Sequence, residues 1–386
     1  MVPALFLQSD VTDPYALYSK QLAEHPVYRD EESGVWAVYS YALCRQLLAA
    51  DAGMIPPVAT EGLNEYALAI TGRLVRLSNG PGHAVARQSA MLLFQSRLPV
   101  STRDILPGLL PRQPGGLEID WVESVGKKLP VLHLLAGFAI SREDGLFIAG
   151  HMDTLVKLMA PVKTDAQVAA VNALSAEIYT RLERHIRNNA VLMEVVGAVV
   201  AGCGISEEEG LALCISNLAG LLVQSYDACR GILSNALLHF LRNPGLAPLK
   251  DRNMDYWLQA VTEVFRFDPP VHHTRRVAGE DIGAGYGIIK KGQTILLVLA
   301  AANRDAGQFA NPDKYNPARP NNSTHLGFGF GAHMCAAKAF STQLATEALQ
   351  YLFEQYSSVR LLKEAIAYEP LANLRIPKRM AISLAV

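Results

Sequence analysis

Apolar residues spaced three and four positions apart dominate the chain, and this spacing predicts a mainly helical protein. The first such segment runs from Pro14 to Glu24, and a short apolar strand is expected at 34–38. Helical spacing is almost continuous from residue 117 to residue 241. The longest predicted helix begins at Ser206 and runs to Leu241, where Asn243-Pro244-Gly245 ends it.

Interruptions of the helical pattern predict loops and a small amount of β-structure. Between Ala52 and Thr71 the periodicity fails and glycine and proline residues break the chain, so we expect a long loop with room for one helical turn. A strong helix is expected at 256–267, ending before a double proline, and 271–277 is expected to be extended. Segments 288–292 and 294–298 are typical of two strands of one hairpin. The predicted fold class is therefore mainly α with small β-sheets.

The composition is typical of a large globular protein and bears on which classes of partner it binds. The 386 residues are 50% hydrophobic and 18% charged, which suffices for a sizeable core. The formal net charge of -1 gives no electrostatic argument for binding nucleic acid or a membrane surface. We expect no membrane-spanning run, because Glu194 and Asn217 interrupt the most apolar segments.

Cysteine usage indicates a reducing compartment. The five cysteines are dispersed, odd in number and without a C-x-x-C pair, which argues against a disulfide framework and a zinc site. No basic segment precedes an apolar run near the N-terminus. A soluble, cytoplasmic protein is expected.

One cysteine lies in a sequence that suggests metal ligation. Cys335 follows a turn containing Gly329 and Gly331, glycines that allow a tight backbone path, and precedes a helical run expected from Ala336. A helix N-terminus favours the thiolate over the thiol. Taken alone, Cys335 would be interpreted as a small buried residue at a helix start.

The flanking residues give the cysteine a more specific meaning. The pattern F-G-x-G-x-H-x-C closely resembles the haem-binding loop of the cytochrome P450 family, in which the cysteine is the axial haem ligand. The resemblance implies haem b (iron protoporphyrin IX), with Cys335 as its metal ligand and Phe328 and His333 beside it. Phe330 is a candidate to shield the sulfur. The family usually has glycine two residues after the cysteine, whereas this chain has Ala337, whose extra methyl group is expected to shift the haem slightly.

A histidine and an arginine form a second candidate site. His83 and Arg87 are one helical turn apart and suit a carboxylate, although such pairs are more often a solvated helix face. The resemblance assigns both to a haem propionate. It gives a further propionate contact to Arg276, with Arg275 as the alternative.

The middle of the longest predicted helix contains an unusual polar cluster. In the family, small residues followed by an acid and a threonine open a groove for dioxygen and relay protons at this point. Alignment from the helix end places Asp227 on the acid and Ala228 on the threonine, while Gln224 and Ser225 replace the small pair. The alternative for Asp227 is an ion pair with Arg230.

Glu263 and Arg266 form an E-x-x-R sequence that would ordinarily be a surface pair. The resemblance implies a structural network in which the Glu263 carboxylate is shared between Arg266 and Arg319.

Substrate contacts are expected from several separate segments. The resemblance places Val223, Val271, His272 and Ala372 in a substrate pocket. Because His272 and His273 alternate faces of an extended segment, at most one of them is expected to face that pocket.

The resemblance runs from His83 to the C-terminal strands and implies one catalytic domain, 1–386, with haem between the long distal helix and the proximal Cys335 loop. It implies O2-dependent monooxygenation of a small organic, secondary-metabolite-type substrate, as in soluble bacterial members. Electrons would come from NAD(P)H through a reductase and a separate ferredoxin or flavodoxin. Two alternatives stay open: a haem-thiolate enzyme that does not hydroxylate (oxidative coupling, rearrangement or peroxide-driven oxidation), and an inactive haem-binding partner protein.

Overall fold

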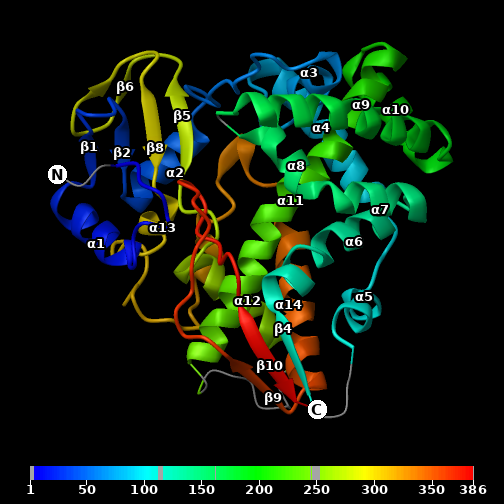
Figure 1. Ribbon diagram of the computed structural model, residues 1–386. Coiled ribbons are helices and arrows are strands. Elements are labelled where there is room, and N and C mark those ends of the chain that lie inside the picture. Colours follow the sequence, from blue (N-terminus) through cyan, green and yellow to red (C-terminus); the bar gives the residue numbers. More distant parts are fainter. Residues whose placement is uncertain (1–3, 112–115, 161, 244, 246–252, 386) are drawn as a thin grey trace. The chain divides into compact units, whose positions relative to one another are not determined.

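The computed structural model describes residues 4–111, 116–160, 162–243, 245 and 253–385 (Figure 1). Its contacts group into two compact units. Unit 1 comprises Met1–Met54, Thr102–Leu129 and Asp227–Val386, and unit 2 comprises Ile55–Ser101 and Pro130–Tyr226. Helices α6 (Leu129–Gly137) and α11 (Glu207–Arg242) cross the boundary between the units. That the whole chain acts as a single catalytic domain stays a prediction.

Unit 1 contains the two larger β-sheets of the protein together with several helical segments. Its helical segments are α1 (Pro14–Glu24), α2 (Tyr41–Ala49), α5 (Thr102–Leu109), η1 (Val122–Gly126), α12 (Met254–Phe267), α13 (Leu299–Ala302), η4 (Asn322–Thr324), η5 (Gly331–His333) and α14 (Lys338–Gln355). Its strands are β1 (Val27–Arg29), β2 (Trp36–Val38), β3 (Gly53–Met54), β4 (Leu117–Asp120), β5 (Thr274–Ala278), β6 (Ile282–Gly283), β7 (Ile288–Ile289), β8 (Thr294–Leu297), β9 (Ser358–Leu361) and β10 (Ala381–Ala385).

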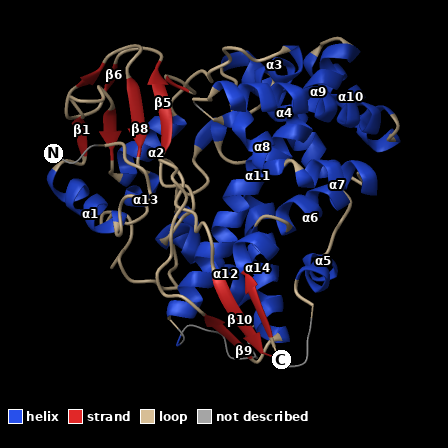
Figure 2. Ribbon diagram, viewed as in Figure 1, coloured by secondary structure: helices blue, strands red, loops and turns tan. Residues whose placement is uncertain are grey.

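The strands of unit 1 form a five-stranded sheet, a three-stranded sheet and one short pair (Figure 2). In the first sheet the order is β1-β2-β8-β5-β3, and β2 and β8 are parallel with Trp36 opposite Ile295. In the second sheet the order is β4-β10-β9, and both pairings are antiparallel. Because β10 lies at the C-terminus, this sheet joins segments far apart in the sequence.

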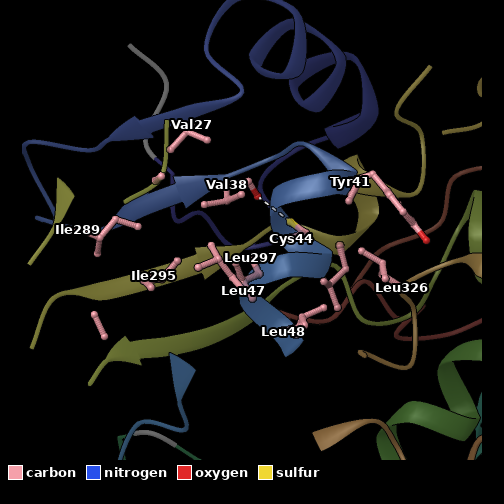
Figure 3. Packing of buried hydrophobic residues seen from close by; sticks show 14 of the residues in the cluster. Val27, Val38, Tyr41, Cys44, Leu47, Leu48, Ile289, Ile295, Leu297 and Leu326 are labelled. Carbon is pink, nitrogen blue, oxygen red and sulfur yellow. Dashed lines mark hydrogen bonds between the residues drawn. The ribbon is translucent and has the colours of Figure 1, made fainter. Parts of the chain in front are cut away.

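The five-stranded sheet packs against α2, and this contact positions the segment that leads to Cys335. Val38, Cys44, Leu47 and Leu297 are almost fully buried in one apolar cluster (Figure 3). Leu326, nine residues before Cys335, belongs to the same cluster, and Phe330 packs against it. Burial of these side chains therefore holds the approach to the cysteine loop against the sheet core.

Unit 2 consists of helices in its described residues: α3 (Glu65–Gly72), α4 (Gly80–Ser96), α7 (Arg142–Gly150), α8 (Met152–Leu155), η2 (Val156–Met159), α9 (Asp165–Arg187) and α10 (Ala190–Cys203). The Thr164 side chain caps α9 and the Gln167 side chain reaches back to the cap, a complete capping box. Gly204, with a φ of 64°, ends α10 in the left-handed conformation.

The mainly α fold with small sheets is confirmed, and several element boundaries agree with the sequence. Helix α1 has the predicted bounds because the Asp13 side chain caps it. Helix α11 ends at Arg242, while Pro244 of the predicted stop lies outside the described residues. The predicted loop 52–71 contains more helix than the single turn allowed for, because the eight-residue helix α3 begins in its last part. Asn64 accepts a hydrogen bond from the Ala67 N–H there, a cap that the sequence analysis overlooked.

Two strand predictions are corrected by long-range pairing. Strand β7 pairs with β6, whereas β8 pairs with β2 and β5, so the predicted hairpin of 288–292 with 294–298 is wrong. Residues 117–120 were expected to be helical but form β4, because β10 supplies a partner strand about 260 residues later in the chain.

All five cysteines are free, as the sequence predicted. One helix in the described part of the chain, α11, is long and apolar enough to cross a membrane, in spite of Asn217. Of its most apolar window, 78% is buried inside the protein, as in the core helix of a globular protein. Helices α9 and α10 pass the same test only when joined, and they are bent by 95° at their break.

Candidate active site

The cysteine loop of unit 1 folds back on itself through backbone hydrogen bonds. The Cys335 N–H donates to the Phe328 carbonyl at 2.9 Å, and the Met334 N–H donates to the Gly331 carbonyl at 3.0 Å. Cys335 itself is exposed, unlike Cys44, Cys214 and Cys229, which are buried. The loop therefore presents one accessible thiol.

Gly331 is required where the loop crosses α2. Its φ is 72°, in the left-handed region. A Cβ at this position would lie 2.8 Å from the Leu48 carbonyl oxygen and 3.0 Å from the Ala49 Cα. Because both contacts are with backbone, no side-chain movement could relieve them. The predicted tight path is present, and α2 is what makes it tight.

The helix that follows starts later than predicted. Helix α14 begins at Lys338 with Ala337 as its N-cap residue, so Cys335 precedes the cap by two residues. The thiol is near the helix N-terminus but outside its first turn, which weakens the expected dipole effect. Ala337 has a φ of -92°, a conformation that costs alanine nothing. Alanine in place of glycine therefore introduces no backbone strain.

Aromatic rings support the loop from two sides. The Phe328 ring lies 4.4 Å from that of Phe265, centroid to centroid, and the Lys338 ammonium lies 5.9 Å from the Phe328 centroid. Phe330 turns toward α2, where the Arg45 guanidinium lies 4.6 Å from its centroid. Its described contacts thus anchor the loop to α2, and the suggested shielding of the sulfur stays a prediction.

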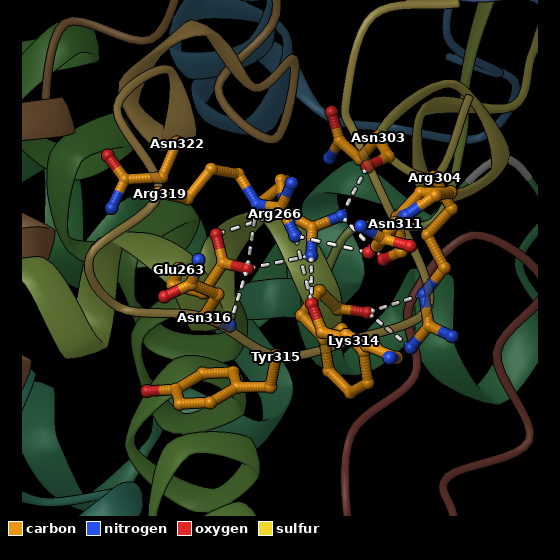
Figure 4. A network of polar contacts seen from close by, with 12 residues as sticks. Glu263, Arg266, Asn303, Arg304, Asn311, Lys314, Tyr315, Asn316, Arg319 and Asn322 are labelled. Atoms are coloured by element: carbon orange, nitrogen blue, oxygen red, sulfur yellow. Dashed lines mark hydrogen bonds and ion pairs between the residues drawn. The ribbon is translucent and has the colours of Figure 1, made fainter. Parts of the chain in front are cut away.

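The structure brings Glu263, Arg266 and Arg319 together in a buried network (Figure 4). Arg266 donates from Nε and Nη2 to the two Glu263 oxygens at 2.9 and 2.7 Å, and Arg319 Nε donates to Oε1 at 3.2 Å. Glu263 and Arg266 are 0% exposed, so they do not form a surface pair. Burial lowers the pKa of Arg266, and the Glu263 carboxylate opposes that shift.

Asp227 on α11 is held by an ion pair with Arg230. Arg230 Nη2 lies 2.8 Å from Asp227 Oδ1, and Arg230 Nη1 lies 3.1 Å from Glu369 Oε1. The Arg230 side chain is buried, whereas a quarter of the Asp227 side chain is exposed. The pairing weighed as the alternative for Asp227 is therefore present. A carboxylate in an ion pair can still accept a further hydrogen bond, and the role of Asp227 in proton transfer stays a prediction.

The remaining polar residues of this helix have local bonding of their own. The Ser225 hydroxyl donates to the carbonyls of Leu221 and Leu222 in the preceding turn. Gln224 lies against Gly220, where an added Cβ would meet its Nε2 at 3.2 Å. Val223 is buried. Ala228 is partly exposed and offers only a methyl group.

The predicted propionate ligands occupy separate units, and their common role stays a prediction. In unit 2, His83 is buried on α4 one turn before Arg87, and burial together with the Arg87 charge lowers the pKa of His83. In unit 1, Arg276 is buried on β5, and its Nη1 donates to Thr274 Oγ1 at 3.1 Å and to the Arg275 carbonyl at 2.8 Å. His333 ends η5, beside the cysteine loop.

The predicted pocket segments 271–272 and 372–374 lie side by side. Val271 forms an isolated bridge with Leu374, and the His272 N–H donates to the Asn373 carbonyl at 2.9 Å. The His272 side chain is fully buried between two tyrosines: Nδ1 lies 3.0 Å from the Tyr18 hydroxyl and Nε2 lies 3.4 Å from the Tyr15 hydroxyl. Both ring nitrogens of His272 therefore face tyrosines of α1, and its role in a substrate pocket stays a prediction.

Some residues at the site gave only a weak signal in the sequence or none. Arg230 is three residues from Asp227, which identified it as a partner, but Glu369 lies 139 residues further on. Tyr15 and Tyr18 likewise contact His272 from the opposite end of the chain. Contacts of this kind depend on tertiary packing and leave no local pattern.

The residues at the cysteine loop fit a haem group. No cluster of three or more His, Cys, Asp or Glu suited to a metal ion occurs among the described residues. The accessible Cys335 thiol is therefore the candidate protein ligand of this loop. One protein ligand suits a metal ion whose other ligands come from a macrocycle, as in haem.

Comparison with known proteins points in the same direction. The family model described as "Cytochrome P450" matches residues 247–361, the stretch that contains Glu263, Arg319 and Cys335. The chain is 24% identical over 386 residues to "Biotin biosynthesis cytochrome P450" of Bacillus subtilis (strain 168), covering 96% of both proteins.

Solved structures of similar proteins share the fold. P450BioI in complex with hexadec-9Z-enoic acid ligated acyl carrier protein superposes with a TM-score of 0.82 at 22% identity, covering 98% of this chain and 99% of that one. P450 RauA complexed with a biosynthetic intermediate of aurachin RE superposes with a TM-score of 0.79 at 22% identity, covering 97% of this chain and 96% of that one.

Proposed function

Because the chain belongs to the cytochrome P450 family of haem-thiolate monooxygenases, we propose that it inserts one oxygen atom of O2 into a small organic substrate by hydroxylation or epoxidation. The observation that supports this best is the accessible Cys335 thiol, which follows a glycine turn packed closely against the backbone of α2.

Different residues would bind different parts of haem b. Cys335 would supply the axial thiolate and Phe328 and His333 would flank it, while His83, Arg87 and Arg276 would bind the propionates. Bound haem supplies the activation of dioxygen, which thiolate donation promotes. The protein's own contribution is to position substrate, limit access of water and deliver protons.

Insertion of one oxygen atom, with reduction of the other to water, consumes two electrons and two protons. We propose that the electrons come from NAD(P)H through a reductase and a separate ferredoxin or flavodoxin, in the cytoplasm.

Proton delivery would differ from the common arrangement. Ala228 has no hydroxyl, and the Ser225 hydroxyl is committed to the carbonyls of its own helix. Asp227 remains, held by Arg230. A water or a polar group of the substrate, bound beside Asp227, would then complete the path.

The substrate is proposed to be of the secondary-metabolite type, which the complex of RauA with a biosynthetic intermediate supports by analogy. A second candidate is a haem-thiolate reaction without hydroxylation, such as oxidative coupling, rearrangement or peroxide-driven oxidation. The lack of a hydroxyl group at Ala228 favours this second candidate, because the proton requirements of such reactions differ from those of hydroxylation by O2.

The proposal is tested by spectroscopy and then by turnover. Reduced protein with carbon monoxide should absorb at the thiolate-ligated Soret position, and Cys335→Ser should lose that band while Cys44→Ser keeps it. An unchanged band in Cys335→Ser would refute haem-thiolate ligation. Oxygen consumption that yields product with a surrogate ferredoxin and reductase would support monooxygenation. Product formed only with added peroxide would favour the second candidate.

A further inference from the structure

His325 lies ten residues before Cys335, in the core of unit 1. Its ring is 5% exposed and stacks on the ring of Phe265 from α12, with centroids 5.8 Å apart and an interplanar angle of 5°. The Phe328 ring lies 5.6 Å from the His325 ring and 4.4 Å from the Phe265 ring, centroid to centroid. These three rings form one aromatic cluster at the start of the cysteine loop.

The His325 ring also bonds the backbone of the loop. The Gly327 N–H donates to His325 Nδ1 at 3.0 Å, and the Leu326 N–H donates to Asn303 Oδ1 at 2.7 Å. Residues 325–330, all of them described, form neither helix nor strand. Side chains therefore supply the acceptors for two consecutive N–H groups that secondary structure would otherwise satisfy.

Gly327 shows how closely the ring fits against this backbone. A Cβ at Gly327 would lie 3.0 Å from His325 Nδ1 and 3.0 Å from the Phe265 carbonyl oxygen. Contacts this short would force the ring or the turn to shift. The glycine therefore allows the backbone to approach the ring closely enough for the hydrogen bond.

The surroundings keep His325 in the form that accepts this bond. Burial lowers the pKa of His325 to about 3, and the charges of Lys338 and Arg266 add to this effect, so the ring is neutral near pH 7. A neutral ring has one N–H and one lone pair. Because Nδ1 accepts from Gly327, its lone pair is used there and Nε2 carries the proton.

Two further hydrogen bonds connect this anchor to Cys335. The Gly329 N–H donates to the Leu326 carbonyl at 2.8 Å, which closes a turn around Gly327 and Phe328. The Phe328 carbonyl then accepts the Cys335 N–H at 2.9 Å. One peptide unit and one hydrogen bond therefore separate the group that His325 holds from the backbone of the cysteine.

We propose that His325 is a positioning residue for the axial ligand: by holding the Gly327 N–H, its Nδ1 sets the position of Cys335 and so the strength of thiolate donation to the haem iron. This inference rests on the proposed function, because it takes Cys335 as the haem ligand. The competing explanation is that the ring only fills space beside Phe265.

Two variants separate the acceptor from the ring. His325→Asn removes the aromatic ring but offers Oδ1, an atom that commonly accepts the N–H two residues further on. His325→Phe keeps an aromatic ring beside Phe265 but has no acceptor. His25→Phe, at an exposed histidine, is the control and should behave as wild type.

Hydrogen exchange measures how often the loop opens. It is followed by mass spectrometry on peptides that span 326–335 in the purified haem protein. His325→Phe should exchange about two- to tenfold faster than wild type there, the worth of one hydrogen bond. His325→Asn should stay within about twofold of wild type.

Two properties of the haem report on the ligand itself. The reduction potential of His325→Phe should be higher than that of wild type, because a displaced thiolate donates less electron density to the iron. The thiolate-ligated share of its carbon monoxide band should fall. His325→Asn should keep both properties close to those of wild type, since it restores the acceptor.

Three results would overturn the inference. The first is a His325→Phe protein that matches wild type in exchange, potential and band. The second is a His325→Asn protein that changes as far as His325→Phe, including loss of haem in both, which would assign the effect to the ring. The third is faster exchange in His325→Phe with an unchanged potential and band, which would make the residue structural only.

A His325→Phe protein that holds no haem, next to a His325→Asn protein that holds as much as wild type, would support the inference. Failure of the proposed function is recognised separately, because wild type itself would then lack the thiolate-ligated carbon monoxide band.

Discussion

Removing the Glu263 carboxylate should destabilise the folded protein more than any change to an exposed ion pair. Its two oxygens accept four hydrogen bonds, three from Arg266 and Arg319 and one from the Asn316 N–H. In Glu263→Ala the two guanidinium groups would remain buried with no negative charge between them. Each also donates to backbone carbonyls, Arg266 to Asn303 among others, so the residues stay in place but lose their counter-charge.

The magnitude follows from burial. Breaking a buried ion pair on one side costs about 3–5 kcal/mol, because the remaining charge is uncompensated. The free energy of unfolding of a typical domain is about 5–15 kcal/mol, so this loss removes a large share of it. Glu263→Ala should therefore unfold at much lower denaturant concentration and accumulate with little bound haem. Denaturation followed by circular dichroism, and the haem-to-protein ratio after purification, measure the two effects.

A matched exposed pair provides the control. Lys290 Nζ and Asp281 Oδ2 are 2.8 Å apart, close to the 2.7 Å between Arg266 and Glu263, but their side chains are 60% and 51% exposed. Asp281→Ala should barely change the unfolding midpoint, because water solvates the lysine that is left. If Glu263→Ala shifts the midpoint no further than Asp281→Ala, the reasoning from burial is refuted.

Three further predictions concern other parts of unit 1. Gly331→Ala should fold with little haem, measured as the Soret-to-protein absorbance ratio, because the added methyl would lie 2.8 Å from the Leu48 carbonyl oxygen; a normal ratio would show that the loop can shift. Ala228→Thr should raise the ratio of product to peroxide for substrates without a polar group near the oxidised carbon, and an unchanged ratio would contradict the proposed proton path. Burial lowers the pKa of His239 to about 4, below its ordinary value of 6.5, so the unfolded chain binds the proton first and stability is lost as the pH falls from 6.5 toward 4. His239→Phe should flatten that loss by up to about 1.4 kcal/mol per pH unit, measured by denaturation at several pH values; an identical slope would be evidence against the assigned shift.

Local signals were sufficient for the features that a short stretch of chain decides. Asp13 and the proline after it mark the start of α1, and the double proline after α12 marks its end. The spacing of Glu263 and Arg266 likewise places both side chains on one face of α12. The order of residues around Cys335 identified the loop through its resemblance to a known haem-binding loop, and the structure adds that Gly331 lies where the backbone meets α2.

Features that depend on distant partners could not be predicted in this way. The partner of β7 is β6 and not β8, a choice made by the assembled sheet. Alternation indicated that His272 and His273 face opposite ways, but the sequence could not show that His272 is the one that contacts Tyr15 and Tyr18.

The ion pair with Arg230 limits the role that Asp227 can have in proton delivery. An arginine guanidinium does not act as a proton-transfer group, so Arg230 cannot pass a proton to Asp227. A carboxylate paired with a guanidinium accepts hydrogen bonds and does not donate them. Asp227 would therefore orient a proton donor rather than act as the first one, and with Ala228 beside it that donor must be a water or the substrate itself. Because the same guanidinium also holds Glu369, two residues before Leu371, the position of Asp227 is coupled to the segment that pairs with 271–272.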